Sequence, residues 1–562
     1  MSPPKVYDAV VVGSGASGGW AAKVLTEGGM DVLVLEAGPH RVPSRDFTEH
    51  VKSYEVPFRG LGDRRAFAAE QPVQSLCYAC DEYSRQFFVS DRENPYTTPE
   101  GKPFAWIRGR QVGGKTYCWA RESYRFSDHE FKAASRDGFG VDWPFDYAEI
   151  APYYDKVESF IGVSGNRDGL PQFPDGRFLP PMRFSCGEIF AGKVLEARFG
   201  RKLLIDRVAN LTAPLDGRTP CHYCDACQRG CFTQSYFNSP AFTLAAAAAT
   251  GRLTLVTDAV VSHVDTDARG LASGVHYVDR LTRDHRDAAA RVVVLAASTL
   301  ETTRILLNSR SAAHPAGLAN GSGVLGHYLM DHFTVPHATG ILPMLTKAER
   351  EPVGRPCATV MPRHQNLETP DRRFLRGYRY DLWAGQEQFE HAFRTPGFGS
   401  AFKRSVRTRV PTRVTIGAQG ECLPRFENHA RLDATAVDAW GIPALHVSAS
   451  YGDHEAAQAR AMAEDLNDML HAMGAEDATE ARAEPSTFGL NIHEVGTARM
   501  GLDPRTSVLN RFNQAHEVRN LFVTDGACFP SQGPYEPTLT IMAVTVRASE
   551  YLLDEYRRGG LA

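Results

Sequence analysis

The order of apolar runs and glycine turns near the start of the chain predicts a βαβ unit. An apolar run spans residues 8–12, a glycine-containing turn spans 13–18, and a helical stretch follows it. Two glycines at 28–29 stop this helix before a second apolar run over 31–36. Strand, turn, helix and strand in this order are typical of a dinucleotide-binding unit.

Each glycine of the turn has its own physical reason. Gly13 makes the tight turn, Gly15 lets the backbone approach a pyrophosphate, and Gly18 lets helix and strand pack closely. We place Ser17 of the same turn among the cofactor-binding residues, because the phosphates lie at the helix N-terminus. Glu36 closes the second strand, where a carboxylate hydrogen-bonds ribose hydroxyls and disfavours a 2′-phosphate.

Later apolar runs extend the same layer. Residues 292–297 form a near-continuous β run, which is typical of a parallel strand buried on both faces, and a helix is expected over 300–308. We expect a further strand over 253–264.

From about residue 332 to 485 the pattern changes to strands separated by Pro and Gly turns. This pattern predicts an antiparallel sheet, which a helix over 453–473 covers. The expected strands lie at 358–361, 377–383, 413–418 and 444–450.

Composition and charge exclude some classes of binding partner. The 562 residues include 62 Lys and Arg against 66 Asp and Glu, a formal net charge of -4, so the basic excess of a nucleic-acid or anionic-membrane surface is missing. No apolar run approaches the roughly 18 residues that a spanning helix needs. The N-terminus lacks the charged region, apolar region and cleavage site of a signal peptide. We therefore expect no nucleic-acid binding, no membrane span and no export signal of the chain's own.

Four of the eleven cysteines, Cys221, Cys224, Cys227 and Cys231, have the spacing CxxCxxCxxxC. Such short spacing wraps a loop around an iron–sulfur cluster, as in ferredoxins. Structural zinc, disulfides and free thiols are the alternatives. A four-iron cluster is favoured over a three-iron one. Phe232 stands where ferredoxins often have proline, and the fourth cysteine of two-cluster ferredoxins ligates the other cluster. The three-iron and the four-iron cluster therefore both remain open.

Several motifs together carry a resemblance to a known family. They are the N-terminal turn, the segment 107–119 with its paired glycines, the segments 143–154 and 438–443, the HxxGTxRMG string that begins at His493, and the strand, Asp-Gly pair and helix that close the chain. On these residues the chain resembles the glucose-methanol-choline (GMC) oxidoreductases, a family of FAD-dependent alcohol oxidoreductases, over nearly its full length.

The resemblance implies an α/β Rossmann-like FAD-binding domain, discontinuous in sequence, plus an α+β substrate domain with an antiparallel sheet, like p-hydroxybenzoate hydroxylase. We expect residues 1–331 and 485–562 to form the FAD-binding domain, with the cysteine cluster at 221–231 inserted in it. Residues 332–484 are expected to form the substrate domain.

The resemblance also implies the site residues. His493 takes the family's active-site histidine role, for which a group of near-neutral pKa suits proton removal. Glu536 stands where the family has His or Asn, and we expect it to accept a hydrogen bond from a substrate hydroxyl; a purely structural role is the alternative. The remaining expected FAD contacts are Arg110, Gly113, Gly114, Cys118, Val261, Asp525, Gly526, Pro537 and Thr538.

Two further expectations concern cofactors. Cys118 replaces the histidine that some sugar-oxidising relatives bond covalently to FAD, so we expect non-covalent FAD. An iron–sulfur cluster is a one-electron relay, which a dehydrogenase that reduces a protein acceptor needs.

The iron–sulfur members of the family that the chain resembles are sugar dehydrogenases, including glucoside 3-dehydrogenases. The expected reaction moves a hydride from a ring hydroxyl carbon to flavin N5 and passes electrons through the cluster to an acceptor such as cytochrome c. A small Tat-exported partner subunit is expected, with a periplasmic location by co-export or a cytoplasmic one. An oxygen-using alcohol or pyranose oxidase and a non-catalytic flavoprotein are the alternatives.

Overall fold

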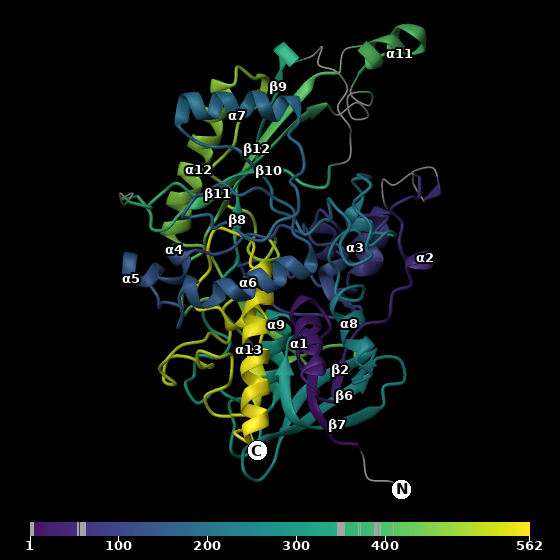
Figure 1. Cartoon of the computed structure of the whole chain (residues 1–562), viewed down its shortest axis with the longest axis vertical. Helices are drawn as coiled ribbons and strands as arrows, with labels where there is room; N and C mark the ends of the chain where they lie inside the picture. The colour runs from purple at the N-terminus through teal and green to yellow at the C-terminus, as the bar shows by residue number, and fades with distance from the viewer. Residues whose placement is uncertain are drawn as a thin grey trace.

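The computed structural model describes residues 5–52, 55–56, 63–345, 355–368, 370, 373–386, 392, 395–408 and 410–561. Two seven-stranded sheets lie toward opposite ends of an elongated molecule, and a two-stranded sheet is separate from both (Figure 1).

The first sheet is mostly parallel. In spatial order its strands are β4 (Leu253–Val256), β2 (Val32–Leu35), β1 (Tyr7–Val12), β7 (His285–Leu295), β6 (Ala272–Asp279) and β5 (Ala259–Thr266), and β16 (Leu521–Val523) also pairs with β7. The second half of β7 runs parallel to β1 and β16, while its first half is antiparallel to β6. One long strand therefore belongs to both parts of the sheet.

Helices bury one face of this sheet. They are α1 (Ala16–Glu27), α8 (Thr243–Ala249) and α13 (Thr538–Arg558). α1 packs against both α8 and α13, and Figure 1 shows α1 and α13 side by side. Apolar side chains of β1, β2 and β7 form one buried cluster with those of the three helices. This packing confirms the expected parallel layer, because both faces of such strands need covering.

The strand expected over 253–264 is confirmed as β structure but is divided in two. Its residues form β4 and β5, which lie at opposite edges of the sheet. Asp258 between them has φ 58°, a left-handed conformation that ends an extended strand, and its N–H donates to the carbonyl of Gly38 at 3.1 Å. The predicted strand over 292–297 and helix over 300–308 are confirmed by β7 and by α9 (Thr299–Asn308).

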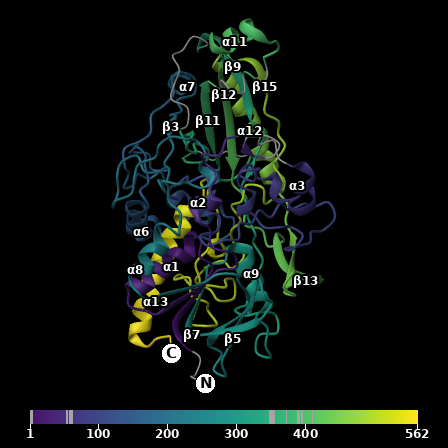
Figure 2. The ribbon, with the colours of Figure 1, turned by 90° about the vertical axis from the view of Figure 1, so that its right-hand side faces the viewer.

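The second sheet is antiparallel, as predicted. Its order is β15 (Glu476–Thr479), β9 (Ala338–Leu342), β12 (Thr412–Gly420), β11 (Tyr378–Gln386), β10 (Thr359–Met361) and β3 (Leu204–Ile205), and β8 (Phe333–Thr334) also pairs with β12. The expected helix over 453–473 is confirmed as α12 (Asp453–Ala472), which packs on β12 and β9. Figure 2 shows this sheet above the parallel layer.

One predicted strand of this layer pairs elsewhere. Residues 444–450 contribute β14 (Pro443–Ser448), which pairs with β13 (His429–Val437) as the separate two-stranded sheet. Conversely, β3 and α7 (Cys186–Phe199) join the antiparallel layer from an earlier part of the chain. The proposed division of the chain at 331 and 484 stays a prediction.

The other helices are short or connect the layers. They are α2 (Pro43–Asp46), α3 (Arg64–Glu70), α4 (Asp128–Phe131), α5 (Ala133–Asp137), α6 (Tyr147–Ile161) and α11 (Gly399–Thr408), with 3₁₀ turns η3 (Gln74–Leu76), η4 (Arg85–Phe87), η5 (Gly114–Tyr117), η6 (Cys227–Arg229), η7 (Pro343–Leu345) and η8 (Gly526–Cys528). Among the residues that the structure describes, no helix is both long and apolar enough to cross a membrane.

Candidate active site

The turn after β1 requires glycine at both ends. Gly13 has φ +96°, and a Cβ there would lie 2.4 Å from the carbonyl oxygen of Ala296. A Cβ on Gly18 would lie 1.9 Å from the carbonyl oxygen of Gly13. Both approaches are shorter than any real carbon contact, so a side chain at either position would displace the turn.

Gly15 faces open space, and across it lies the second glycine segment. The nearest atom to a Cβ on Gly15 would be the carbonyl oxygen of Gly113, at 4.0 Å. A Cβ on Gly114 would lie 3.5 Å from Gly15 Cα. Ser14 connects the two segments, because Gly113 N donates to its hydroxyl oxygen at 2.9 Å. Two backbone strips without side chains therefore face each other at the N-terminus of α1, and such a cradle fits a pyrophosphate.

Glu36 and Ser17 stand beside this cradle. Glu36 accepts hydrogen bonds from the Ser14 hydroxyl and from the N–H of Gly38 at 2.9 Å. Burial raises the pKa of its carboxyl, and these hydrogen bonds oppose the rise. Ser17 Oγ lies 2.8 Å from Thr524 Oγ1 and accepts from Thr545 Oγ1 at 3.1 Å, which ties α1 to the segment after β16 and to α13.

Arg110 offers an unused donor. Its Nη2 donates to Glu301 at 3.3 Å, whereas its Nη1 is buried without a hydrogen-bond partner. A buried guanidinium nitrogen without an acceptor carries a desolvation cost that an anion would remove.

Two other predicted FAD contacts are also buried. Val261 is buried on β5. Cys118 is buried in an apolar cluster with Cys77 and Cys80, and burial raises the pKa of its thiol to about 12.

The predicted contacts near α13 lie in a buried region. Asp525 accepts from Thr302 Oγ1 and from the N–H of Ala527 at 3.0 Å, and burial raises the pKa of its carboxyl to about 6. Gly526 follows it, and its carbonyl accepts from Gly496 N at 3.0 Å. Pro537 is the N-cap residue of α13 and Thr538 is the first helical residue. The partly positive N-terminus of a long helix therefore opens beside Glu536.

His493 is fixed by hydrogen bonds at both its backbone and its ring. Its N–H donates to Asp331 Oδ1 at 2.9 Å, and its carbonyl accepts from Gln532 Nε2 at 3.2 Å. Its Nδ1 lies 3.0 Å from the Nδ1 of His332. Desolvation lowers the pKa of the half-buried His493 to about 3, and the positive charges of Arg379 and Lys115 act in the same direction.

The hydrogen-bond network assigns the tautomers of this pair. His332 Nε2 faces the carbonyl oxygen of Gly533, which only accepts, so His332 carries its proton on Nε2. Its Nδ1 is then an acceptor, which also suits the donor Gln532 Nε2 at 3.2 Å. His493 must donate through Nδ1–H, which leaves its Nε2 as a lone-pair base. The same burial lowers the pKa of His332 to about 3, so both rings are neutral.

The sequence analysis missed Asp331, His332 and Gln532. The first two were taken only as the border of the substrate domain, and Gln532 was not considered. A signal was present in the sequence, because Asp331 and His332 are two polar residues that interrupt an otherwise mostly apolar stretch over 329–335.

Glu536 lies in a buried group of charges. Its Oε1 forms an ion pair with Arg379 and accepts from Gln419 Nε2 at 3.1 Å. Arg379 also pairs with Glu122, at 3.0 Å, and with Asp381. Burial alone would raise the pKa of Glu536, but Arg379 outweighs it and lowers the pKa. The contact of Glu536 with substrate stays a prediction.

The four clustered cysteines lie on one loop. Cys227 and Cys231 are buried, Cys221 is half-buried and Cys224 is exposed. Two residues of the loop adopt left-handed conformations, Tyr223 with φ 57° and Asp225 with φ 53°, as does Gly230 with φ +86°. Backbone N–H groups of Tyr223 and Ser235 donate to the sulfurs of Cys221 and Cys231, each at 3.4 Å.

Tyr236 joins this loop to the segment with the paired glycines. Its hydroxyl contacts the carbonyl oxygen of Cys227 at 3.1 Å and that of Tyr117. Tyr117 ends η5, which begins at Gly114. The cysteine loop and the cofactor cradle are thus connected through one side chain.

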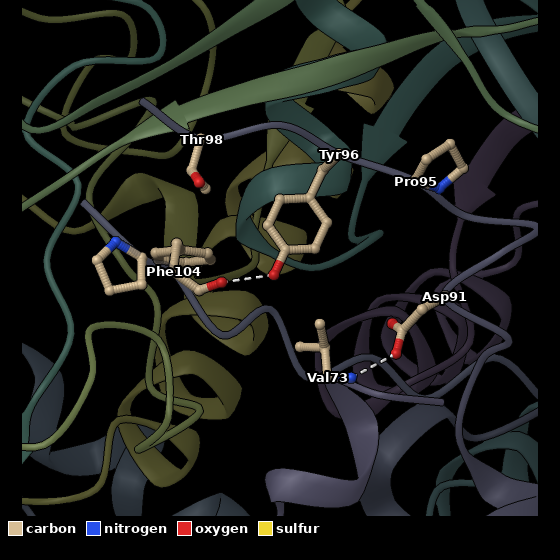
Figure 3. Close-up of a pocket in the computed structure, with 7 residues that line it drawn as sticks. Val73, Asp91, Pro95, Tyr96, Thr98 and Phe104 are labelled. Atoms are coloured by element: carbon tan, nitrogen blue, oxygen red, sulfur yellow. Dashed lines mark hydrogen bonds between the residues drawn. The ribbon is translucent and has the colours of Figure 1, made fainter. Parts of the chain in front are cut away.

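The structure also contains a cavity of about 340 Å³, which is lined by residues between Val73 and Phe104 (Figure 3). The Tyr96 hydroxyl donates to the carbonyl of Phe104 at its wall, and Val73 N donates to Asp91 at 2.8 Å. Its other lining residues are Pro95, Thr98 and Pro103. None of the predicted site residues lines it.

Comparison with known proteins agrees with this architecture. Two family models described as GMC oxidoreductase match residues 7–334 and 424–545. The chain is 28% identical to 2-methyl-1,2-propanediol dehydrogenase of Mycolicibacterium austroafricanum, over 97% of this chain and 95% of that protein. It is 28% identical to the fructose dehydrogenase large subunit of Gluconobacter japonicus, over 98% of each chain. It is also 28% identical to paromamine 6′-oxidase of Streptomyces fradiae, over 97% of this chain and 91% of that protein.

Solved structures share the fold at lower identity. Pyridoxine 4-oxidase from Mesorbium loti has a TM-score of 0.62 at 16% identity, covering 98% of this chain and 99% of that one. A formate oxidase variant of Aspergillus oryzae RIB40 has a TM-score of 0.63 at 15% identity over the whole of both chains.

Proposed function

The chain belongs to the GMC oxidoreductase family, and we propose that it is the catalytic subunit of an FAD-dependent sugar dehydrogenase that passes electrons through an iron–sulfur cluster. The observation that carries the proposal is Tyr236, whose hydroxyl contacts Cys227 of the cysteine loop and Tyr117, the last residue of the turn η5 that begins at Gly114. An enzyme that reoxidises directly with oxygen has no need of such a connection.

The residues of the cradle fit FAD. The open gap at Gly15 faces Gly113, and the unpartnered Nη1 of Arg110 supplies a donor for an anionic group. These residues, with Glu36 and the N-terminus of α13, would hold the dinucleotide. FAD, when bound, supplies the acceptor for the hydride that leaves the substrate carbon.

His493 removes the proton from the substrate hydroxyl. Its Nε2 lone pair is available because Gly533 fixes the proton of His332 on Nε2, and this in turn fixes the proton of His493 on Nδ1. A pKa of about 3, well below the near-neutral value expected from the sequence, keeps the ring neutral at physiological pH and leaves Nε2 free to accept a proton, although as a weaker base than an ordinary imidazole.

Glu536 orients a polyhydroxylated substrate. Its buried carboxylate is kept ionised by Arg379 and by a hydrogen bond from the Glu122 carboxyl, whose own pKa burial raises well above its usual range. A charged acceptor of this kind favours a substrate with a hydroxyl beside the reacting one. Two relatives named fructose dehydrogenase and paromamine oxidase support a sugar-like substrate, and the ring hydroxyl of a glucoside is the site we propose.

Support for the cluster comes from the cysteine loop. Hydrogen bonds from backbone N–H groups to thiolate sulfurs are a feature of iron–sulfur sites, and the loop makes two of them. We further propose a cytochrome c-type acceptor and a small partner subunit, in keeping with the relative named as a large subunit. Co-export with that partner to the periplasm is the proposed location.

An oxygen-using oxidase is the second candidate, because paromamine 6′-oxidase matches the chain almost as well as the dehydrogenases do. One experiment separates the two. Protein purified without oxygen is analysed for iron and labile sulfide and then mixed with a panel of sugars and glucosides under argon. Flavin bleaching, iron with matching sulfide, and turnover with cytochrome c but no peroxide support the proposal. Peroxide formation by protein that lacks iron contradicts it.

A further inference from the structure

Three side chains beside the cysteine loop form a group that the proposed reaction does not use. They are Glu49, His50 and His222, and one ligand atom of each lies within 4.8 Å of those of the other two. His50 Nε2 is 3.2 Å from Glu49 Oε1, and the two imidazole rings have centroids 5.5 Å apart. Two imidazoles and one carboxylate are a common ligand set for a divalent transition metal.

The protein fixes the position of Glu49. Its segment is held against the end of the cysteine loop, since Thr48 N donates to the carbonyl of Arg229 at 3.0 Å and Phe232 N donates to Glu49 Oε1 at 2.5 Å. Phe47 packs so closely on Gly230 that a Cβ there would lie 2.4 Å from its ring. The carboxylate therefore has one orientation, with one oxygen already engaged.

The second oxygen of this carboxylate lacks a partner. The Glu49 side chain is only 1% exposed, and its Oε2 has no hydrogen-bond donor. A buried, unpartnered carboxylate oxygen is unfavourable because it has lost its hydration, and a cation removes that cost. The two histidines are exposed, so their rings can rotate to meet an ion from solvent. Thr233 Oγ1 lies 3.3 Å from His222 Nδ1, a contact that would leave Nε2 to the metal.

We propose that Glu49, His50 and His222 bind one zinc ion, separate from the cysteine cluster, with water completing the coordination. The ion joins two segments that are far apart in the chain, the stretch after α2 and the loop that begins at Cys221. It therefore clamps the outer side of the cysteine loop.

The test uses the flavin-loaded enzyme, treated with a chelator and titrated with zinc chloride in a calorimeter. One zinc per chain is expected. In Glu49→Gln and His222→Ala, affinity should fall by at least the roughly 10- to 100-fold that loss of an outer-shell partner alone causes. His471→Ala is the matched control, because His471 is exposed and lies 3.1 Å from a single carboxylate, Glu480. Its affinity should equal that of wild type.

Zinc-edge X-ray absorption identifies the ligands. Nitrogen and oxygen at about 2.0–2.2 Å are expected, with no sulfur at about 2.3 Å. A sulfur shell, or zinc binding that is lost in Cys224→Ser but kept in Glu49→Gln, overturns the site. His50→Ala guards against misfolding, since His50 is 61% exposed. If it binds zinc as tightly as wild type, the proposal is also wrong. Iron and sulfide content reports on the cysteine cluster separately.

Discussion

The centre around His493 and the cysteine loop are built in opposite ways. The first collects side chains from four distant stretches, around Asp331, Arg379, His493 and Gln532, and encloses them. The second is one loop of consecutive residues, buried at Cys227 and exposed at Cys224. An enclosed centre can shift pKa values and select a tautomer, because low polarity strengthens each contact. A loop at the surface can exchange electrons with another protein.

The largest expected effect is on the enclosed centre. His493→Ala removes the base, so flavin reduction by substrate under argon should slow by about 100- to 10,000-fold, the range for general acid–base groups. FAD content should not change. Stopped-flow absorbance measures the rate, with His471→Ala as the control for loss of an imidazole. An unchanged rate would show that another group takes the proton.

The next largest effect is expected from a change in the cysteine loop, which should slow acceptor turnover but not flavin reduction. Cys227→Ser is expected to lose iron and sulfide, and turnover with a cytochrome acceptor should then fall more than tenfold. Flavin reduction by substrate should stay near the wild-type rate, because the loop does not contact the reacting carbon. Cys186→Ser, a change at an exposed cysteine of α7, is the control. Acceptor turnover that survives loss of the cluster would contradict the relay.

A smaller effect tests substrate contact at Glu536. Glu536→Gln weakens a hydrogen bond to a charged acceptor, so KM should rise about tenfold while kcat changes less. Glu421→Gln is the matched control, since Glu421 is also buried, pairs with Arg376 at 3.1 Å, and has an unpartnered Oε2. Equal effects of the two changes would mean that the residue acts through stability alone.

Loss of the Tyr236 hydroxyl, which connects the two regions, should have a modest effect on stability and on acceptor turnover. Tyr236→Phe removes a hydroxyl and should cost about 1 kcal/mol of the free energy of unfolding. Cytochrome turnover should slow severalfold while flavin reduction is unaffected. Tyr154→Phe, which removes a buried hydroxyl 2.7 Å from Thr540, should show a similar stability loss with normal turnover. Normal turnover in Tyr236→Phe would remove the residue from the electron path.

The smallest expected effect is that of pH on the rate of flavin reduction. Because the pKa of His493 is about 3 rather than 6.5, the neutral base is present throughout pH 5–8, and the rate of flavin reduction should not fall with acid in that range. Lys115→Met removes a charge that lowers this pKa, so any acid limb should move to higher pH. An acid limb near pH 6.5 in the wild type would show that the ring is not desolvated.

The sequence predicted what neighbouring residues determine. The turn at Gly13, Gly15 and Gly18 was predicted because its glycines are needed by local backbone geometry, which spacing reveals. His332 was missed because its role depends on the carbonyl of Gly533, which only folding brings to its ring. The ion pair of Glu536 could not be predicted for the same reason, since Arg379 lies on β11, far away in the chain.

Strand pairing shows the same limit. The run over 253–264 was correctly identified as β structure, yet Asp258 divides it between two edges of the sheet. Alternation of apolar residues predicts that a strand exists, whereas its partners are chosen by long-range packing. The antiparallel sheet was likewise predicted, but the strand at 443–448 pairs outside it.

The position of α13 has a consequence for biosynthesis. This helix packs against α1, which follows the turn that begins at Gly13, and its Thr545 hydroxyl donates to Ser17. At about 5–20 residues per second, a ribosome needs roughly half a minute to two minutes to proceed from one to the other. Throughout that interval the nascent N-terminal unit lacks a helix that covers it. Stable packing of α1 in this layer must therefore wait until α13 has been synthesised.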